Sequence, residues 1–290
     1  MGNYAQYLQR MTDSAIQTTK QLMPVYAAST MRTIEKPRIL EVGIGSGIIG
    51  KLLRDAIPNA YLVGIDINAS NIKEAIETEI YDECLTQDFM TYEASPFDLI
   101  IFSSVVHEIC AYDTRFKYDA ESTLDAVFKH SACLLHKNGY VILRDGLAED
   151  IELRNDDETY YMEDTKSVEL LIRFMDEFRC FVQEEFEMRT VSIQIHRQES
   201  GRMYFEITCP RWLMREFLCT ATWGLESWER EIKERFCFSD NDTIQYFLNK
   251  YDFNVEHALF TSERYNEYFK KLIKFPNEQD LIGLYVAKKL

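Results

Sequence analysis

The sequence predicts an α/β protein with a doubly wound parallel sheet and an inserted, mainly helical cap. Short apolar segments alternate with amphipathic helical segments up to residue 146, which is typical of parallel sheets. The alternation stops over residues 147–238 and resumes afterwards. We therefore expect an N-terminal helical segment over 1–36, a main domain made of 37–146 and 239–290, and a cap subdomain over 147–238.

Local patterns predict the individual elements of the main domain. A stripe of apolar residues predicts a helix over 3–30, and Pro37 ends that pattern. The continuous apolar run at 97–103 is typical of the buried centre of a parallel sheet. The expected strands are 38–42, 61–67, a short one ending near 87–88, 97–103, 140–144, 253–260 and 281–287, and the expected helices run from the turn at 43–47 to about residue 56, and over 70–81, 119–136 and 241–250.

The cap region is rich in acids, arginines and aromatic residues. We expect helices near 158–187 and 211–236 and a strand pair around 188–208. Because this region interrupts the main domain between its fifth strand and the next helix, we expect it to fold over the functional site.

Composition and charge narrow the class of protein. The 290 residues suffice for one α/β domain with an insertion, no apolar run is long enough to span a bilayer, and the seven cysteines form no Cys-x-x-Cys pair. We expect a cytoplasmic protein with reduced thiols and no membrane partner. The formal net charge of −16 makes a nucleic-acid partner less expected, because phosphate binding normally needs a basic face.

A glycine-rich turn follows the first predicted strand. Glu41 is followed by Gly43, Gly45 and Gly47, and a helix is expected directly afterwards. Glycines allow a sharp turn and a close approach of the backbone to a ligand, and the helix directs free N–H groups toward that ligand. The same stretch also satisfies the G-x-G-x-x-G pattern of nicotinamide enzymes.

Several side chains favour a methyl donor over a dinucleotide. Glu41 can receive the amino group of a methionine moiety, Asp66 can accept the ribose hydroxyls, and Asp88 with Phe89 can bind adenine. Ile67 and Ser103 end the second and fourth strands and complete the expected cofactor site. The alternatives are structural, since Asp66 could cap a helix, Asp88 could be a solvated loop acid and Phe89 could be core.

This order of motifs, continued by Phe97-Asp98-Leu99-Ile100 and a strand that begins at Gly139, resembles class I S-adenosylmethionine-dependent methyltransferases over about 37–146 and 240–290. The resemblance implies a mostly parallel seven-stranded sheet with an antiparallel last strand, and S-adenosylmethionine as cofactor at the carboxyl ends of the strands. Family members that methylate adenine N6 or glutamine often carry an Asn/Asp-Pro-Pro-Tyr-like segment after strand four. This chain has Ser-Ser-Val-Val at 103–106, which counts against those acceptors.

Candidate catalytic residues follow the fourth and fifth strands. His107 could act as a general base, and Glu108 could orient it or replace it. Asp145 could accept a substrate proton or help to hold a divalent metal with Glu108. Each also has a structural alternative, as a hydrogen-bonded histidine, an ion-pair partner and a cap. We expect no metal, because no compact cluster of ligands stands out.

Candidate acceptor-binding residues lie on the same rim and in the cap. Arg211 and Arg215 fall on one helical face and could clamp a carboxylate or phosphate, unless Glu229, Glu231 and Glu234 neutralise them. The full expected set is Tyr112, Arg144, Arg211, Arg215 and Trp223.

The sequence therefore predicts an S-adenosylmethionine-dependent methyltransferase for a small or medium-sized acceptor enclosed under the cap. The chain could also form a homo-oligomer. Three alternatives remain open at this point: an RNA or protein methyltransferase, a non-catalytic sensor or scaffold subunit that binds the methyl donor, and a nicotinamide enzyme.

Overall fold

The computed structural model describes residues 19–116, 119–149, 156–178, 191–197, 201–261, 272–274 and 282–290. The chain divides into two compact units. Unit 1 comprises residues 1–145, 242–260 and 282–290, and unit 2 comprises 146–241 and 261–281. The helix expected over 3–30 is described from residue 19 onward, as η1 (Thr19–Gln21) and α2 (Leu22–Met31), and its first part lies outside the described residues.

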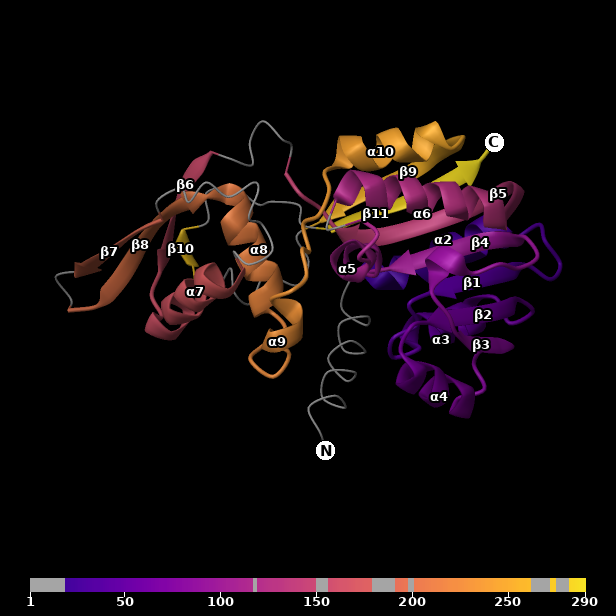
Figure 1. Cartoon of the computed structure of the whole chain (residues 1–290), viewed down its shortest axis with the longest axis horizontal. Coiled ribbons are helices and arrows are strands. Elements are labelled where there is room, and N and C mark those ends of the chain that lie inside the picture. The colour runs from indigo at the N-terminus through magenta and orange to yellow at the C-terminus, as the bar shows by residue number, and fades with distance from the viewer. Residues whose placement is uncertain are drawn as a thin grey trace. The chain divides into compact units, whose positions relative to one another are not determined.

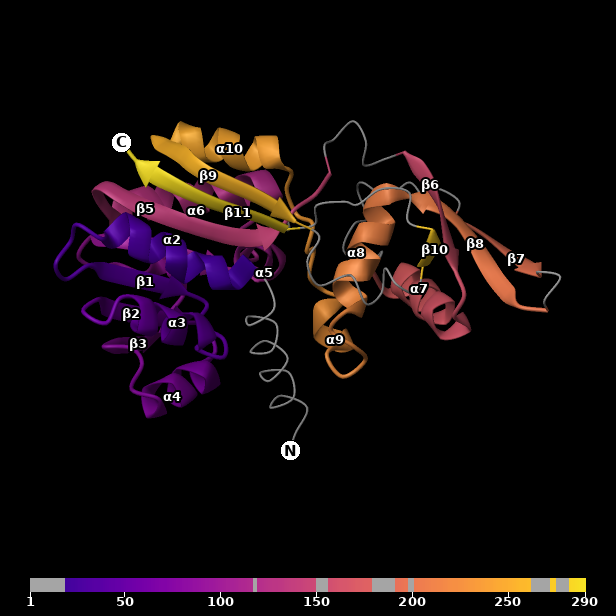
Figure 2. The same cartoon turned by 180° about the vertical axis from the view of Figure 1, so that it is seen from behind.

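Unit 1 is built on a seven-stranded sheet with the order β3-β2-β1-β4-β5-β11-β9. Strands β1 to β5 pair in parallel, and β11 runs in the opposite direction to β5 and β9 beside it (Figures 1 and 2). The mostly parallel sheet with an antiparallel last strand is thus confirmed. The strands are β1 (Arg38–Val42), β2 (Tyr61–Asp66), β3 (Glu83–Thr86), β4 (Phe97–Ser103), β5 (Leu135–Gly146), β9 (Phe253–Thr261) and β11 (Ile282–Lys289).

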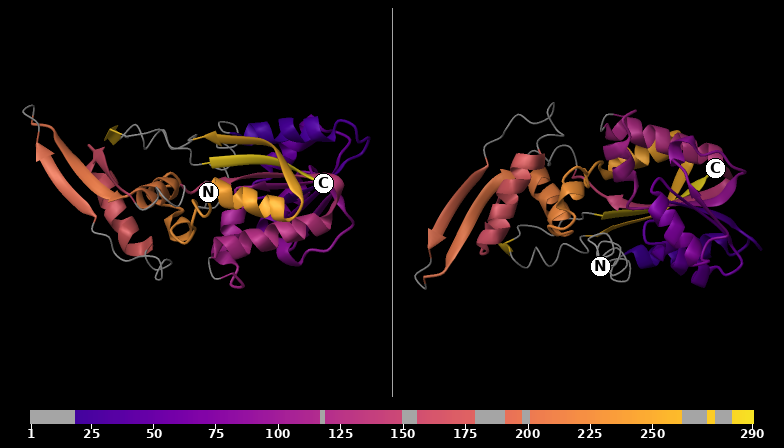
Figure 3. Two further views of the ribbon diagram at one scale, coloured as in Figure 1. Left: turned by 90° about the horizontal axis from the view of Figure 1, so that it is seen from above. Right: turned by 60° about the horizontal axis from the view of Figure 1, so that its bottom comes forward.

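Helices cover both faces of this sheet, as a doubly wound fold requires. The helices of unit 1 are α2, α3 (Ile48–Ala56), α4 (Ala69–Glu77), α5 (Val106–Tyr112), α6 (Ala120–Leu134) and α10 (Asn241–Lys250). Helices α2 and α3 lie on one face and α6 and α10 on the other (Figure 3). Met23 and Leu53 pack with Leu99 and Ile101 in the core between α2, α3 and the sheet.

The strand order shows where an open α/β sheet of this kind would bind a ligand, at the carboxyl ends of its strands. Strands β2 and β4 flank β1 on opposite sides, so the connections after β1 and β4 leave the sheet in different directions. Ligands of open α/β sheets bind at such a switch point, outside the carboxyl ends of the strands. Because β1 to β5 are parallel, the segments that follow these five strands all begin on the same side of the sheet, called here the carboxyl edge.

Unit 2 contains a sheet as well as helices, which differs from the mainly helical cap that was expected. A four-stranded sheet has the order β10-β6-β8-β7. The elements are β6 (Asp157–Met162), α7 (Thr165–Phe178), β7 (Ser192–Arg197), β8 (Met203–Pro210), α8 (Arg211–Ala221), α9 (Trp228–Glu231) and β10 (Leu272–Lys274). The strand pair expected around 188–208 is present, but residues 157–162 are strand rather than helix. The helix expected over 211–236 is broken at Gly224, whose φ is 78°.

The boundary of unit 2 also differs from the expected cap. Residues 261–281 group with unit 2, although the sequence placed 239–290 in the main domain. The reason is that β10 pairs with β6. The core of unit 2 is aromatic: Phe174 stacks on Phe178 at 4.6 Å between ring centroids and meets Trp228 edge-on. Among the helices that the structure describes, none has both the length and the apolar character needed to cross a membrane.

Candidate cofactor and active site

The glycine turn between β1 and α3 has the backbone that the sequence predicts. Gly43, Gly45 and Gly47 have φ values of 69°, 50° and 72°, a region in which side chains are disfavoured. A Cβ atom on Gly43 would lie 2.5 Å from Cγ2 of Val105, which follows β4. The turn therefore packs directly on the neighbouring connection, and glycine is required for space as well as for conformation.

Asp66 ends β2, and its carboxylate links the glycine turn to the start of α4 through hydrogen bonds. Its carboxylate accepts hydrogen bonds from Gly45 N at 3.1 Å, Asn68 N at 2.8 Å and Asn71 Nδ2 at 2.9 Å. The helix cap of α4 is Asn68, not Asp66. Because a carboxylate has about four acceptor positions, Asp66 keeps capacity for a ligand hydroxyl. The adjacent Ile67 is 70% exposed and offers an apolar surface beside it.

Glu41 is buried beneath the turn. It accepts a hydrogen bond from Tyr81 Oη at 2.8 Å, and burial raises the pKa of Glu41 to about 8. Tyr81 fits there because two positions lack side chains: a Cβ on Gly50 would lie 2.2 Å from Tyr81 Oη, and one on Gly64 would lie 3.0 Å from the ring. Local sequence patterns did not point to Tyr81, because Gly50 and Gly64 leave space for a neighbour without showing which residue fills it. A cation bound beside Glu41 would favour its ionised form.

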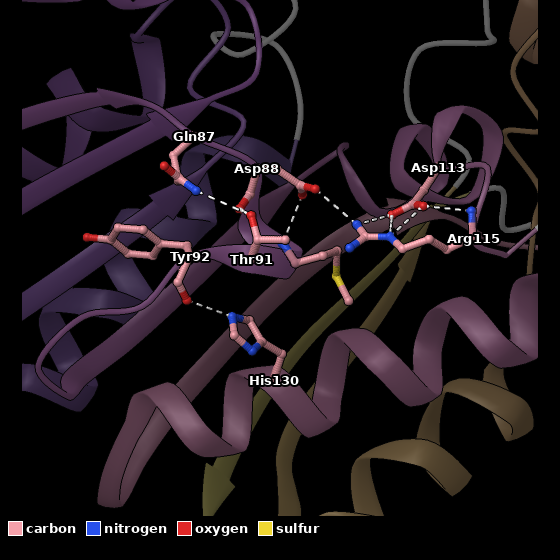
Figure 4. Close-up of polar contacts among 8 residues, drawn as sticks. Gln87, Asp88, Thr91, Tyr92, Asp113, Arg115 and His130 are labelled. Atoms are coloured by element: carbon pink, nitrogen blue, oxygen red, sulfur yellow. Dashed lines mark hydrogen bonds and ion pairs between the residues drawn. The ribbon is translucent and has the colours of Figure 1, made fainter.

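Asp88 lies just beyond β3, with its carboxylate held by two donors (Figure 4). Oδ1 accepts from Met90 N at 2.9 Å and caps η2 (Phe89–Thr91), while Oδ2 accepts from Arg115 Nη2 at 3.0 Å. Phe89 is buried, and its ring meets Phe102 of β4 edge-on at 5.1 Å. The ring thus belongs to the core, as in the structural alternative for Phe89.

Two serine hydroxyls at the same edge fit a polar ligand. Ser46 lies in the glycine turn and Ser103 ends β4, the strand next to β1. The Oγ atoms of both residues are buried and find no hydrogen-bond partner within the described part of the chain. A buried hydroxyl without a partner costs about 1–3 kcal/mol. The positive-φ turn, Asp66 and these hydroxyls therefore fit a cofactor with a polar amino acid end and a ribose.

His107 and Asp145 form a buried pair where β4 and β5 end. His107 Nδ1 lies 2.5 Å from Asp145 Oδ1, and Oδ2 of Asp145 accepts from Val106 N at 2.8 Å and from His107 N at 3.2 Å. Asp145 therefore caps the first turn of α5, a helix that the sequence analysis did not predict. The exposed fractions of His107 and Asp145 are 3% and 2%. Glu108 follows in the same turn and is half-buried.

The other predicted acceptor residues of unit 1 differ in role. Arg144 is buried and donates to Ser104 Oγ at 2.7 Å and to Thr19 Oγ1 at 3.0 Å. It therefore anchors η1 and the residue after β4, where Ser104 has a φ of 57°. Tyr112 ends α5 and is exposed.

The two arginines of α8, Arg211 and Arg215, pair with other groups of unit 2. Arg211 Nε donates to both carboxylate oxygens of Glu149, at 2.9 and 3.0 Å, and lies 3.8 Å from Glu158. Arg215 is 2% exposed and donates to the Leu147 carbonyl at 2.9 Å. Glu149 also lies 3.4 Å from Arg215 and so supplies counter-charge to both arginines. Trp223 is half-buried beyond the end of α8.

Comparison with known proteins identifies the family of the chain. A family model described as a methyltransferase domain matches residues 7–258. The release factor glutamine methyltransferase of Fusobacterium nucleatum is 38% identical over 89 residues, 31% of this chain and 21% of that protein. Ribosomal RNA small subunit methyltransferase C of Haemophilus influenzae is 28% identical over 120 residues, 40% of this chain and 34% of that protein. The matches span only about a fifth to a third of these relatives.

Solved structures resemble this chain at low sequence identity. The plantazolicin methyltransferase BpumL, solved with a monoazolic desmethylPZN analog and SAH, has a TM-score of 0.50 and 10% identity, covering 99% of this chain and 88% of BpumL. An S-adenosylmethionine-dependent methyltransferase from Clostridium acetobutylicum has a TM-score of 0.49 and 12% identity, covering 97% of both chains. Since the family model covers most of the chain, this protein belongs to the methyltransferase domain family, with the class I α/β fold and S-adenosylmethionine as its cofactor.

Proposed function

We propose that the chain transfers the methyl group of S-adenosylmethionine to a small or medium-sized acceptor. The observation that carries the proposal is the buried His107–Asp145 pair, which lies at the same sheet edge as the glycine turn. In this proposal the glycine turn and Glu41 would hold the amino acid end of the cofactor. Asp66 would hold the ribose, and Ile67 and Asp88 would hold the adenine.

The pair suits removal of a proton from the acceptor. The cofactor supplies a methyl group on a positively charged sulfur, which a nucleophilic atom of the acceptor attacks as the carbon–sulfur bond breaks. Asp145 holds the proton on Nδ1 of His107, so Nε2 is the atom that takes the acceptor proton. The Asp145 carboxylate then stabilises the imidazolium that forms.

The charges of unit 2 favour a small acceptor over RNA. A basic face on α8 was the feature that suggested RNA binding, but Glu149 and Glu158 lie against Arg211, and Arg215 is buried beside Glu149. The net charge of −16 points the same way. A glutamine acceptor, as in the name of the Fusobacterium relative, is disfavoured by the Ser-Ser-Val-Val segment at 103–106.

We also propose a cytoplasmic location for the enzyme. The cysteines in the described residues are free thiols. Free thiols are typical of reducing compartments. Fractionation of the source cells tests this location, and recovery of the protein outside the cytoplasm would contradict it.

Transfer of a tritiated methyl group tests the activity. The purified protein is incubated with labelled S-adenosylmethionine and an extract of its source cells, which is then separated into small molecules, RNA and protein. We expect label in the small-molecule fraction, lost with His107→Gln and kept with the control His196→Gln, whose ring lies in unit 2 beside Glu206.

The other outcomes separate the alternatives. Label in RNA or protein alone would replace the proposed acceptor with the macromolecular classes named for the relatives. Cofactor binding without label in any fraction would favour a sensor or scaffold subunit.

A further inference from the structure

Arg115 links the loop after β3 to the end of α5 (Figure 4). Its Nη2 atom donates to Asp88 Oδ2 at 3.0 Å, and its Nε atom donates to Asp113 Oδ1 and Oδ2 at 2.8 and 2.9 Å. Nη2 also contacts Asp113 Oδ2. One guanidinium thus joins the carboxylates of Asp88 and Asp113, which lie 25 residues apart in the sequence.

The guanidinium itself is fixed on the Asp113 side. Asp113 is the residue that follows α5, and its backbone N–H donates to the Ile109 carbonyl at 3.0 Å. The hydrogen bond from Arg115 holds the pKa of Asp113 below its usual value, so that carboxylate stays ionised. The guanidinium carbon also lies 5.7 Å from the centre of the Phe116 ring. Arg115 therefore approaches Asp88 from a supported position and with a charged partner behind it.

This arrangement fixes the direction of the Asp88 carboxylate. The Met90 N–H holds one oxygen and Arg115 holds the other, so rotation of the carboxylate breaks at least one hydrogen bond. Each oxygen still has an acceptor position left. A side chain that is already held in one orientation loses less conformational entropy when a ligand binds than a side chain that rotates freely. The carboxylate cannot donate, so it selects a ligand that offers N–H groups.

We propose that Arg115, held by Asp113, is a positioning residue that sets Asp88 to accept the exocyclic amine of adenine and so selects 6-aminopurine over 6-oxopurine cofactors. This inference rests on the adenine position proposed above. A 6-oxopurine would present a carbonyl oxygen to the carboxylate, and two acceptors repel each other. Arg115 acts through Asp88 and need not touch the cofactor.

Binding of two nucleosides tests the inference without any acceptor. Dissociation constants for S-adenosylhomocysteine and S-inosylhomocysteine are measured by titration calorimetry for the wild type, Arg115→Ala, Asp88→Asn and the double variant. Arg202→Ala is the control, because Arg202 forms an exposed pair with Glu163 in unit 2. We expect the wild type to prefer the adenine compound by about tenfold or more.

The expected pattern is selective. Arg115→Ala should weaken the adenine compound about 2–5-fold, the range measured for exposed ion pairs, and should change the inosine compound less than twofold. Asp88→Asn keeps an oxygen for Met90 N but loses the anionic acceptor, so the preference should fall to near one. Arg115→Ala should then have no further effect, since interacting residues are not additive.

Two results would overturn the inference. The first is an equal loss for both nucleosides with Arg115→Ala, or a loss as large in the Asp88→Asn background as in the wild type. The second is a wild-type preference that survives Asp88→Asn, which would show that the adenine lies elsewhere. The ratio of the two constants is independent of the folded fraction, so a partly unfolded variant still gives a decision.

Discussion

Replacing Asp145 tests the hydrogen-bond network at the start of α5. The buried carboxylate accepts from two backbone N–H groups and from Nδ1 of His107. Asp145→Ala leaves all three donors without this acceptor in a region that water does not reach. A buried donor left without its acceptor costs about 1–3 kcal/mol, so three donors, which include the capped start of α5, should cost about 3–5 kcal/mol together. We expect the free energy of opening this region to fall by that amount.

Asp145→Asn should separate stability from catalysis. The Asn oxygen can accept from the backbone N–H groups of Val106 and His107, so the loss should be about 1–2 kcal/mol. The Asn amide then faces Nδ1, which has to become an acceptor, and the ring proton moves to Nε2. Nε2 can no longer take a proton from an acceptor. We therefore expect the asparagine variant to bind S-adenosylhomocysteine normally and to transfer methyl groups slowly.

Hydrogen exchange and nitrogen NMR measure both effects. Exchange of the Val106 and His107 amides should accelerate by about 100-fold or more with alanine and by about 30-fold or less with asparagine, at tenfold per 1.4 kcal/mol. The nitrogen shifts of His107 should report a proton on Nδ1 in the wild type and on Nε2 in the asparagine variant. Equal exchange in all three proteins, or an unchanged tautomer, would refute the reasoning.

Three further changes test the cofactor site. Gly43→Ala should reduce thermal stability more than Gly201→Ala. Both glycines have a positive φ, but a Cβ at Gly43 would collide with Val105, whereas one at Gly201 would meet nothing within 4 Å. Equal losses would contradict this. Glu41→Gln should flatten the pH dependence of stability. Burial raises the pKa of Glu41 in the folded state to about 8, so the folded wild type binds more protons than the unfolded chain. Its free energy of unfolding should therefore fall by about 1 kcal/mol per pH unit as the pH rises from roughly 5 to 8. Urea titrations at several pH values measure this slope. Ile67→Ser should weaken S-adenosylhomocysteine several-fold in calorimetry with an unchanged melting temperature, because Ile67 is exposed.

Much of unit 1 could be predicted because its signals are local. The apolar run at 97–103 and the glycines after Val42 are read directly from neighbouring residues, and β4 and the turn lie where they predict. Asp66 also ends its strand as expected. Such elements need no knowledge of distant parts of the chain. The antiparallel position of β11 came from family resemblance rather than from a local pattern.

The elements that were missed depend on distant partners. Helix α5 begins without a local capping side chain, because the cap comes from Asp145, 39 residues beyond Val106. Strand β6 is acidic at its start, and its pairing with β8 places Tyr160 opposite Ile207. Arg115 showed no motif, and its role depends on Asp88 and Asp113 meeting in space. Local patterns cannot report such contacts.

Cofactor binding at the carboxyl edge of the sheet is the central claim, and a thermal shift experiment tests it most directly. The melting temperature is measured with S-adenosylmethionine, S-adenosylhomocysteine, NAD and NADP for the wild type, for Asp66→Ala and for the control Asp98→Ala. Asp98 lies near the start of β4 and accepts a hydrogen bond from Arg38 N at 2.8 Å, away from the proposed site. We predict a rise with the first two compounds alone, lost with Asp66→Ala and kept with Asp98→Ala. A rise with NAD or NADP, or a rise with S-adenosylmethionine that survives Asp66→Ala, would contradict the account.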